Sequence, residues 1–376
     1  MNILYVCTDK GIPLRGAKGA SAHVRQISAA LQAKGHDLTL AVRSMSGANP
    51  DPAVARIVEL SAPQHDQATQ VADLINAHKC SVVLERYALT SGSAAAACAA
   101  LRVPLVYEVN APIVLEAARY RGLEELEAGL AREQGLFNAA AAAVVVSSAL
   151  SHYVSTVASA LPVAVVSNGV DLARFTRCMP RTDRGDRTIR IGFVGSMKPW
   201  HGVEELVTAF AELALREPSV RLVLAGHGPS LASVRAAVDL AHLADRVDIL
   251  HEVRHDQVPS VLATLDLAVA PYRATEDFYF SPLKVLEYLA AGLPVVYPTI
   301  GDLPFLVGEA GLGYPPDDGS ALVACLGRLV GDAGLRAHLG AAAVEHAQSF
   351  GWAGVAARVT ATLENVVPVR SCGGAA

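Results

Sequence analysis

The residues with the clearest potential for chemistry stand at the start of one predicted helix, in the run Ser281-Pro282-Leu283-Lys284. Ser is a favoured N-cap residue and Pro suits the first helical position, so we expect the helix to begin here and to end at Gly292. The free N–H groups and positive dipole of a helix N-terminus bind anions. Lys284 would add a positive charge beside a phosphate, and Glu287 on the same face could accept hydrogen bonds from a ribose diol. An ordinary capped helix with a surface Lys–Glu pair is the alternative, and without further context it is the better interpretation.

Two loops could approach the same anion. Lys198 and His201 lie in a glycine-containing loop between a predicted strand and a helix, which is a plausible phosphate-binding turn. The spacing fits neither a Walker A loop nor G-x-G-x-x-G, so an ordinary βα loop is the alternative. In the first loop of the chain, Gly19 would allow close approach of a ligand to the backbone. His23 follows in the first helical turn, where a structural histidine is the alternative.

The elements that must position these residues show the pattern of two α/β domains. Continuous apolar runs without strict alternation are typical of parallel strands covered on both faces, and amphipathic helical patterns lie between them. The polar and basic run Ala173–Arg190 is a predicted linker. Predicted strands are Ile3–Cys7, Asp37–Val42, Ser81–Glu85, Leu105–Asn110, Ala142–Val146 and Val163–Val166 before the linker, and Thr188–Val194, Arg221–Ala225, Val247–Leu250, Leu267–Ala270 and Pro294–Tyr297 after it.

Composition excludes several classes of protein. A chain of 376 residues suggests two domains, and 52% hydrophobic against 18% charged residues excludes disorder for most of it. A net charge of −5 without a basic stripe argues against a nucleic-acid partner. None of the 6 cysteines has a metal-ligand spacing, which is typical of reduced thiols in the cytosol. Residues 134–170 lack charged side chains but are rich in Ala and Ser, so we expect no transmembrane segment.

Taken together, the motifs resemble those of the family 4 glycosyltransferases of GT-B fold, over nearly the whole chain. The matching segments are Lys18–Val24 (first-loop GG-x-x-x-H-V), Asn168–Phe175 (N-G-V-D-x-x-x-F), Phe193–Gly195 with Gly202 (F-x-G…K-G), Ala225–Pro229 (G-x-G-P) and Ser281–Gly292, the donor-binding helix with Glu287 as the second Glu of E-x7-E. Four positions depart from the family pattern: Tyr279 replaces the first Glu, Ser196 an Arg, His201 a Lys, and Asn110 a His found in many relatives.

The resemblance implies two Rossmann-like, doubly wound α/β domains that face each other across a cleft. We expect an acceptor-side domain at 1–170 and a domain that binds the nucleotide sugar at 171–351. The helix 352–366 is expected to pack back on the first domain, and 367–376 to form a frayed tail.

The implied activity is retaining transfer of a sugar from a nucleotide-diphosphate donor, with a UDP-sugar as the default, to a glycan, lipid-linked or natural-product acceptor. The resemblance assigns Lys198, Lys284, Glu287 and His23 to catalysis; Gly19, Ser196, His201, Val253, Arg254, Tyr279, Ser281, Pro282 and Leu283 to the donor; and Lys18, Glu108 and Asn110 to the acceptor side. The chain has no D-x-D triplet, so we expect no essential metal and no cofactor beyond the nucleotide sugar as co-substrate. A bacterial, cytoplasmic enzyme is expected, with peripheral attachment to the inner membrane face as an alternative.

Two other functions remain open from the sequence. An NDP-sugar 2-epimerase shares the two-domain outline, but the N-G-V-D run and the donor helix fit the transferases better. A non-catalytic member that binds a sugar nucleotide is suggested by the replacements at Tyr279 and Ser196.

Overall fold

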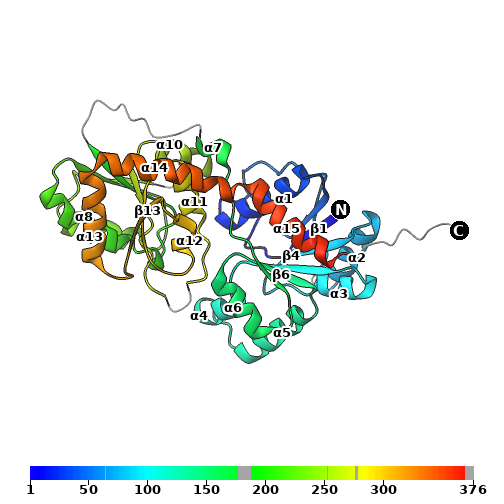
Figure 1. The fold of residues 1–376 in the computed structure, drawn as a ribbon. Helices are drawn as coiled ribbons and strands as arrows, with labels where there is room; N and C mark the ends of the chain where they lie inside the picture. Colours follow the sequence, from blue (N-terminus) through cyan, green and yellow to red (C-terminus); the bar gives the residue numbers. More distant parts are fainter. Residues whose placement is uncertain (64, 177–187, 252, 276–277, 369–376) are drawn as a thin grey trace. The chain divides into compact units, whose positions relative to one another are not determined.

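The computed structural model describes residues 1–63, 65–176, 188–251, 253–275 and 278–368 (Figure 1). The chain divides into two units, Met1–Asn168 with Trp352–Ala376, and Gly169–Gly351. Residues 177–187 of the predicted linker and 369–376 of the predicted tail lie outside the described residues, as do Cys178 and Cys372. Each unit is an α/β domain with a parallel sheet, as the sequence predicts.

The first unit is built on a seven-stranded parallel sheet in the order β3-β2-β1-β4-β5-β6-β7. This order, which reverses beside the first strand, is that of a doubly wound Rossmann-like sheet. The strands are β1 (Asn2–Cys7), β2 (Asp37–Val42), β3 (Arg56–Glu59), β4 (Val82–Arg86), β5 (Leu105–Val109), β6 (Ala142–Val145) and β7 (Val163–Val165). The helices are α1 (Gly19–Ala33), α2 (Gln67–Ala77), α3 (Ser93–Leu101), α4 (Ile113–Tyr120), α5 (Leu126–Asn138), α6 (Ser148–Val157) and α15 (Trp352–Val366).

The last helix of the chain completes the first unit. α15 runs beside α1 (Figure 1), and its buried residues Val355, Val359 and Leu363 share one apolar cluster with Val24 and Ile27 of α1. Both helices thereby cover one face of the sheet, so the apolar stripe of each is removed from water.

The second unit has a six-stranded parallel sheet in the order β10-β9-β8-β11-β12-β13, with apolar clusters on both faces. The strands are β8 (Ile189–Val194), β9 (Val220–Ala225), β10 (Val247–Leu250), β11 (Leu267–Val269), β12 (Val295–Pro298) and β13 (Gly311–Tyr314). The helices are α7 (Leu172–Thr176), α8 (Val203–Arg216), α9 (Leu231–Leu240), α10 (Val258–Leu262), α11 (Leu283–Ala290), α12 (Leu303–Val307), α13 (Gly319–Gly331) and α14 (Ala333–Ala347), with 3₁₀ turns η1 (Pro199–His201), η2 (His255–Gln257) and η3 (Gln348–Phe350). No helix in the described part of the chain is both long and apolar enough to cross a membrane.

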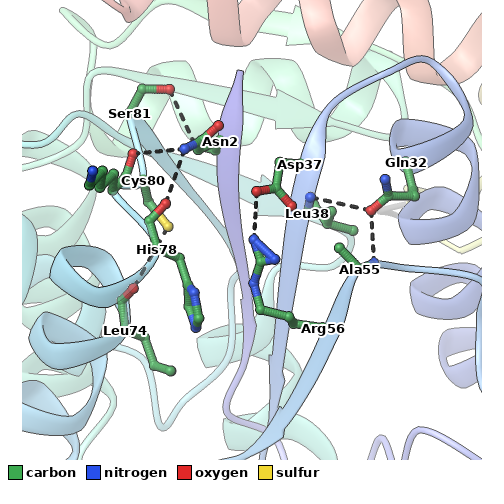
Figure 2. A network of polar contacts seen from close by, with 11 residues as sticks. Asn2, Gln32, Asp37, Leu38, Ala55, Arg56, Leu74, His78, Cys80 and Ser81 are labelled. Carbon is green, nitrogen blue, oxygen red and sulfur yellow. Dashed lines mark hydrogen bonds and ion pairs between the residues drawn. The ribbon is translucent and has the colours of Figure 1, made fainter.

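Two strands that the sequence analysis did not predict, β3 and β13, lie at sheet edges. Polar contacts fix β3, as Figure 2 shows: Arg56 donates to Asp37 at 2.5 Å, and Gln32 Oε1 accepts from the Ala55 N–H at 2.8 Å. On the other side of β1, Asn2 Nδ2 donates to the carbonyl oxygen of His78 at 3.1 Å. These contacts lie at the amino ends of the strands, opposite the edge where ligands bind such sheets.

One carboxyl group of the first unit is buried without compensation. Glu85 of β4 is fully buried, and neither of its oxygens has a hydrogen-bond partner among the described residues. Burial raises the pKa of Glu85 to about 7, although the Ser91 and Tyr107 hydroxyls and the Arg132 guanidinium oppose the rise. The group is therefore neutral in the folded protein at mildly acidic pH.

We expect the Glu85→Gln variant to lose a pH dependence of stability that the wild type has. Between pH 4.5 and about 7 the folded state keeps a proton that the unfolded carboxyl group has released. The free energy of unfolding of the wild type should thus fall by about 3 kcal/mol as pH rises through this range. Urea unfolding at both ends of the range measures the change, with the exposed Glu59→Gln as control. Equal pH dependence in wild type and Glu85→Gln would contradict the burial of an uncompensated acid.

Candidate functional site

The predicted anion-binding helix is α11, and it begins one residue later than the sequence suggests. Pro282 has an extended backbone (ψ 117°), so it flanks the helix and Leu283 is the first helical residue. The prediction of Ser281 as N-cap and Pro282 as first helical residue was therefore wrong. The first bond into the helix joins the Val285 N–H to the Pro282 carbonyl at 3.1 Å. Within the described residues the N–H groups of Leu283 and Lys284 have no acceptor, so two backbone donors are available to a ligand.

The C-terminal end of α11 is as predicted. Gly292 has φ +71° and ends the helix. Its N–H bonds to the Leu289 carbonyl at 2.9 Å, and the Leu293 N–H to the Tyr288 carbonyl at 3.0 Å. This pair of bonds is the Schellman arrangement, which requires the left-handed residue that Gly provides.

Lys284 brings α11 to the loop after β8. Its ammonium nitrogen lies 4.3 Å from the ring centre of Phe193 and 5.2 Å from that of Tyr272. A side chain at Gly195 would place its Cβ 2.9 Å from Lys284 Nζ, and Gly195 has φ +152°. Gly195 is thus required both for its backbone conformation and for the close approach of the lysine. Two segments that the sequence analysis singled out separately, Phe193–Gly195 and the donor helix, meet at this point.

The Lys284 ammonium has no carboxylate partner at ion-pair distance in the described part of the chain. Burial lowers the pKa of Lys284 to about 7, and the charge of Glu287 only partly opposes this. Two aromatic rings stabilise the cation through their faces, but they do not neutralise it. The site thus holds a cation that lacks a protein anion.

His201 lies beside Lys284 as a neutral donor. Its Nδ1 donates to the Ser196 carbonyl, since a carbonyl can only accept. Lys284 Nζ lies 3.4 Å from the same nitrogen. Burial, the nearby Lys284 and Lys198 lower the pKa of His201 to about 3, against the effect of the Ser196 bond. His201 therefore stands where the family has a Lys but carries no charge near neutral pH.

An aromatic group that the sequence analysis left unassigned supports the loop before α11. The Phe280 ring stacks on the rings of Trp200 and Tyr272, with 6.4 Å between ring centres in each case. The ring centre of Tyr279 lies 4.4 Å from that of Phe280. Lys198 Nζ lies 5.8 Å from the Trp200 ring centre. The signal was present in the sequence as Phe278-Tyr279-Phe280, but nothing in it indicated the ring partners.

Glu287 faces His255, with 3.0 Å between Glu287 Oε1 and His255 Nε2, and its side chain is 15% exposed. The turn that carries His255 also contains Arg254, whose guanidinium pairs with Asp256 at 2.5 Å. This pairing lowers the pKa of Asp256. Val253 is half-buried and packs against the apolar cluster of the second unit.

In the first unit, the predicted residues His23 and Glu108 are hydrogen-bonded to each other and almost completely buried. Glu108 also accepts from the Tyr5 hydroxyl at 2.5 Å, and Arg86 lies 3.7 Å away. Burial would raise the pKa of Glu108, but His23, Arg86 and Tyr5 outweigh it and lower the pKa to about 2. The other ring nitrogen of His23 bonds to Asn168 at 2.8 Å.

The remaining predicted residues of the first unit lie nearer to solvent. Asn110 follows β5, and its amide nitrogen is buried without a hydrogen-bond partner among the described residues. Lys18 is exposed and its ammonium donates to the Gly11 carbonyl at 3.2 Å. Gly19 is the first residue of α1.

A cavity of about 590 Å³ lies elsewhere in the second unit, between α8 and α13. Its lining includes Glu205, Glu212, Tyr272, Arg273, Asp317 and Asp318, but not Lys198, Lys284 or Glu287. The described residues contain no group of three His, Cys, Asp or Glu side chains placed to hold a metal ion.

Comparison with known proteins identifies both units. Residues 17–174 match the family model described as Glycosyltransferase Family 4, and residues 188–332 match the model described as Glycosyl transferases group 1. The chain belongs to the family 4 glycosyltransferases. The first match contains His23, Glu108 and Asn110, and the second contains the β8 loop and α11.

Curated proteins that are similar to this chain are named D-inositol 3-phosphate glycosyltransferase. That of Corynebacterium diphtheriae is 32% identical over 68% of this chain and 64% of its own length. That of Corynebacterium efficiens is 31% identical over 56% of this chain and 53% of its own length. That of Salinispora tropica is 34% identical over 50% of this chain and 43% of its own length. The matched region thus spans about half the length of these relatives.

Solved structures show the GT-B fold. Sucrose-phosphate synthase from Thermosynechococcus elongatus has a TM-score of 0.74 at 21% identity, covering 97% of this chain and 99% of its own. Anabaena HepE in complex with UDP has a TM-score of 0.75 at 20% identity, and the match covers 97% of this chain and 100% of HepE. The same protein has also been solved with UDP-glucose, with a TM-score of 0.71 at 19% identity over 96% and 99%.

Removal of one hydroxyl should loosen the site's framework. Tyr288 Oη accepts from the Val194 N–H and donates to the Val194 carbonyl, both at 2.9 Å, and so joins α11 to the end of β8. Tyr288→Phe leaves both buried backbone groups unpaired, so we expect a loss of about 1–3 kcal/mol in the free energy of unfolding. Thermal or urea unfolding measures it, with Tyr120→Phe, whose residue is 59% exposed, as control. Equal stability of both variants would show that the Tyr288 bonds contribute nothing.

Proposed function

We propose that this protein transfers a sugar from a nucleotide-diphosphate donor, a UDP-sugar by default, to an acceptor hydroxyl with retention of configuration. The observation that carries the proposal is a pair of N–H groups, at Leu283 and Lys284, that lies beside the Lys284 ammonium. Within the described residues, neither N–H group has an acceptor and the ammonium has no carboxylate partner. Such donors and such a charge match a diphosphate. The UDP complexes of HepE, which has the same fold, support this choice of ligand.

Each group of the second unit would have a separate task. The Leu283 and Lys284 amides, Lys284 and Lys198 would stabilise the departing diphosphate as its charge grows. Ser281 and Pro282 would hold the amides in place, and Ser196, His201 and Tyr279 would line the sugar side. Glu287 would accept from the ribose hydroxyls, with Val253 and Arg254 near the base. No protein base is needed if the diphosphate itself takes the acceptor proton.

The first unit would supply the acceptor side through Lys18, Glu108 and Asn110, with Gly19 and His23 approaching the donor. Inositol 3-phosphate, which the names of the curated relatives carry, is the first acceptor to test. Glycan, lipid-linked and natural-product acceptors form the remaining panel. The proposed site of action is the cytoplasm or the inner membrane face of a bacterium.

Removal of Lys284 or Glu287 should weaken the binding of UDP without unfolding the protein. A hydrogen bond to a charged group contributes about 1.5–3 kcal/mol, so Lys284→Met and Glu287→Gln should each raise the Kd by about tenfold or more. Calorimetric titration with UDP measures the Kd, and the exposed Lys34→Met and Glu364→Gln serve as matched controls. Wild-type affinity in both site variants would overturn the proposed donor site.

Product analysis then separates the three functions that the sequence left open. A transferase gives a glycosylated acceptor together with free nucleoside diphosphate. A 2-epimerase converts UDP-GlcNAc alone into UDP-ManNAc. A non-catalytic member binds UDP-sugars but gives neither product with any acceptor in the panel.

The low pKa of Lys284 predicts that donor binding takes up a proton. At about pH 8 the free lysine is mostly uncharged, and a bound diphosphate would restore its charge by raising its pKa. UDP is already fully ionised at that pH, so the proton must bind to the protein. Titrations in two buffers of different ionisation enthalpy should show uptake approaching one proton at about pH 8 and almost none at about pH 6.

The same linkage predicts that the affinity for UDP falls as pH rises above about 7. Lys284→Arg carries a permanent charge and should show no uptake at either pH. Buffer-independent binding heats in the wild type at the higher pH would show that Lys284 does not change its protonation on binding.

A further inference from the structure

Three side chains from three separate elements form a hydrogen-bonded chain that ends on Glu287. Arg174 of α7 contacts His255 of η2, with 2.8 Å between Nη1 and the ring nitrogen Nδ1. The second guanidinium nitrogen of Arg174 donates to the His255 carbonyl. His255 Nε2 then lies 3.0 Å from Glu287 Oε1 on α11. The three residues are separated by 81 and 32 positions, so only the fold brings them together.

The hydrogen bonds among these three side chains all run in one direction, from Arg174 through His255 to Glu287. A guanidinium carries only donors, so Arg174 must donate to His255 Nδ1, and this nitrogen must accept. The ring hydrogen of neutral His255 is therefore on Nε2, which donates to Glu287 Oε1. The opposite tautomer would place two hydrogens between Arg174 and His255, and would leave Glu287 without a donor.

The N-G-V-D-x-x-x-F run builds the start of this chain. Asp171 accepts from the Arg174 N–H at 3.2 Å and so begins the short helix α7. Phe175 is 1% exposed within the apolar cluster of the second unit, and the Arg174 guanidinium lies 5.8 Å from its ring centre. The capping Asp and the buried Phe hold Arg174 between them, facing His255. The motif thereby gains a local task that the sequence did not indicate.

The remaining oxygen of Glu287 is left for a ligand. Oε1 is taken by His255, and Oε2 has no hydrogen-bond donor among the described residues. A carboxylate with one oxygen fixed and one available can accept from a hydroxyl group in a single orientation, which lowers the entropy lost on binding.

We propose that Arg174 and His255 are positioning residues that hold the Glu287 carboxylate, in one tautomeric arrangement, to accept from a ribose hydroxyl of the donor. The inference rests on the proposed function, because it takes the donor nucleotide as the ligand of Glu287. Both residues would act through Glu287.

The tautomer of His255 tests the chain directly in the ligand-free protein. We expect ¹⁵N-detected imidazole spectra of the full-length protein to show His255 with the hydrogen on Nε2 and an unprotonated Nδ1. In Arg174→Lys this preference should weaken, since a lysine cannot donate to both the ring and the carbonyl in the same planar arrangement. A hydrogen on Nδ1 in the wild type would overturn the proposal, whatever the protein binds.

The effect on ligand binding is tested with UDP by calorimetry. We expect His255→Leu to raise the Kd for UDP about tenfold, because the Glu287 carboxylate is then no longer held in position before the nucleotide binds. His255→Gln, whose amide can still donate toward Glu287, should recover most of the affinity. The two changes His255→Leu and Glu287→Gln should be strongly non-additive in the double variant, since they remove one interaction.

Matched controls separate failure of the inference from failure of the proposed function. Arg235 lies 3.4 Å from His251 in an exposed Arg–His pair of the same unit, so Arg235→Lys should leave the affinity unchanged. Weak binding in Glu287→Gln with wild-type binding in His255→Leu would overturn the positioning role but keep the donor site. Absence of UDP binding in the wild type would overturn the proposed function. The tautomer measurement would still decide whether Arg174, His255 and Glu287 are hydrogen-bonded as described.

Discussion

The arrangement of the second unit depends on Lys284, which no carboxylate of the described residues neutralises. Burying a cation is costly unless it is paired, and aromatic faces compensate only part of that cost. Lys284 is nevertheless held against Phe193, Tyr272 and the backbone of Gly195. Gly195 leaves room for the lysine, and the Tyr288 hydroxyl joins α11 to the end of β8 by hydrogen bonds. The first two N–H groups of α11 have no acceptor among the described residues. A protein that keeps this combination gains stability when an anion binds.

The polar groups around Glu108 and those around α11 differ in how far they are satisfied by the protein. In the first unit, Glu108 accepts from Tyr5 and His23, and His23 is bonded on its other side to Asn168. This network is satisfied internally, so it holds its shape without a ligand. In the second unit, the α11 amides, Lys284 and one oxygen of Glu287 are unsatisfied among the described residues. These groups of α11 lie at the carboxyl end of the second sheet, which is where ligands bind open α/β sheets.

The structure shows what the side chains that depart from the family pattern contact. His201 replaces a positive charge by a neutral ring whose Nδ1 hydrogen is used by the Ser196 carbonyl. Tyr279 replaces a carboxylate by an aromatic ring that packs against Phe280. The site thus lacks two positive charges of the family pattern, at Ser196 and His201, and one negative charge, at Tyr279. Its positive charge rests on Lys284 and Lys198. Family membership follows from the matched segments, which these replacements do not affect.

The sequence alone determined the class of fold and most of its elements. The bounds of β2, for example, were predicted to the residue, because five of its six residues are buried and the strand is mostly apolar. The motifs also predicted the helix α11, and they singled out the β8 loop and Glu287 as candidate site residues. The edge strands β3 and β13 were not predicted, since β3 has no fully buried residue and β13 contains two glycines and one buried residue. The other two edge strands, β7 and β10, were predicted from their Val, Ile and Leu content.

Only the tertiary structure decided which side chains are in contact, and therefore which pKa values are shifted and which nitrogen of a histidine carries the hydrogen. The lowered pKa of Lys284 arises from rings and backbone supplied by β8 and the loop after β11, and the hydrogen on His255 is fixed by an arginine 81 residues away. Such properties depend on distances of a few ångströms between elements remote in the chain. Spacing along a sequence carries no information about those distances until the sheet has brought the loops together.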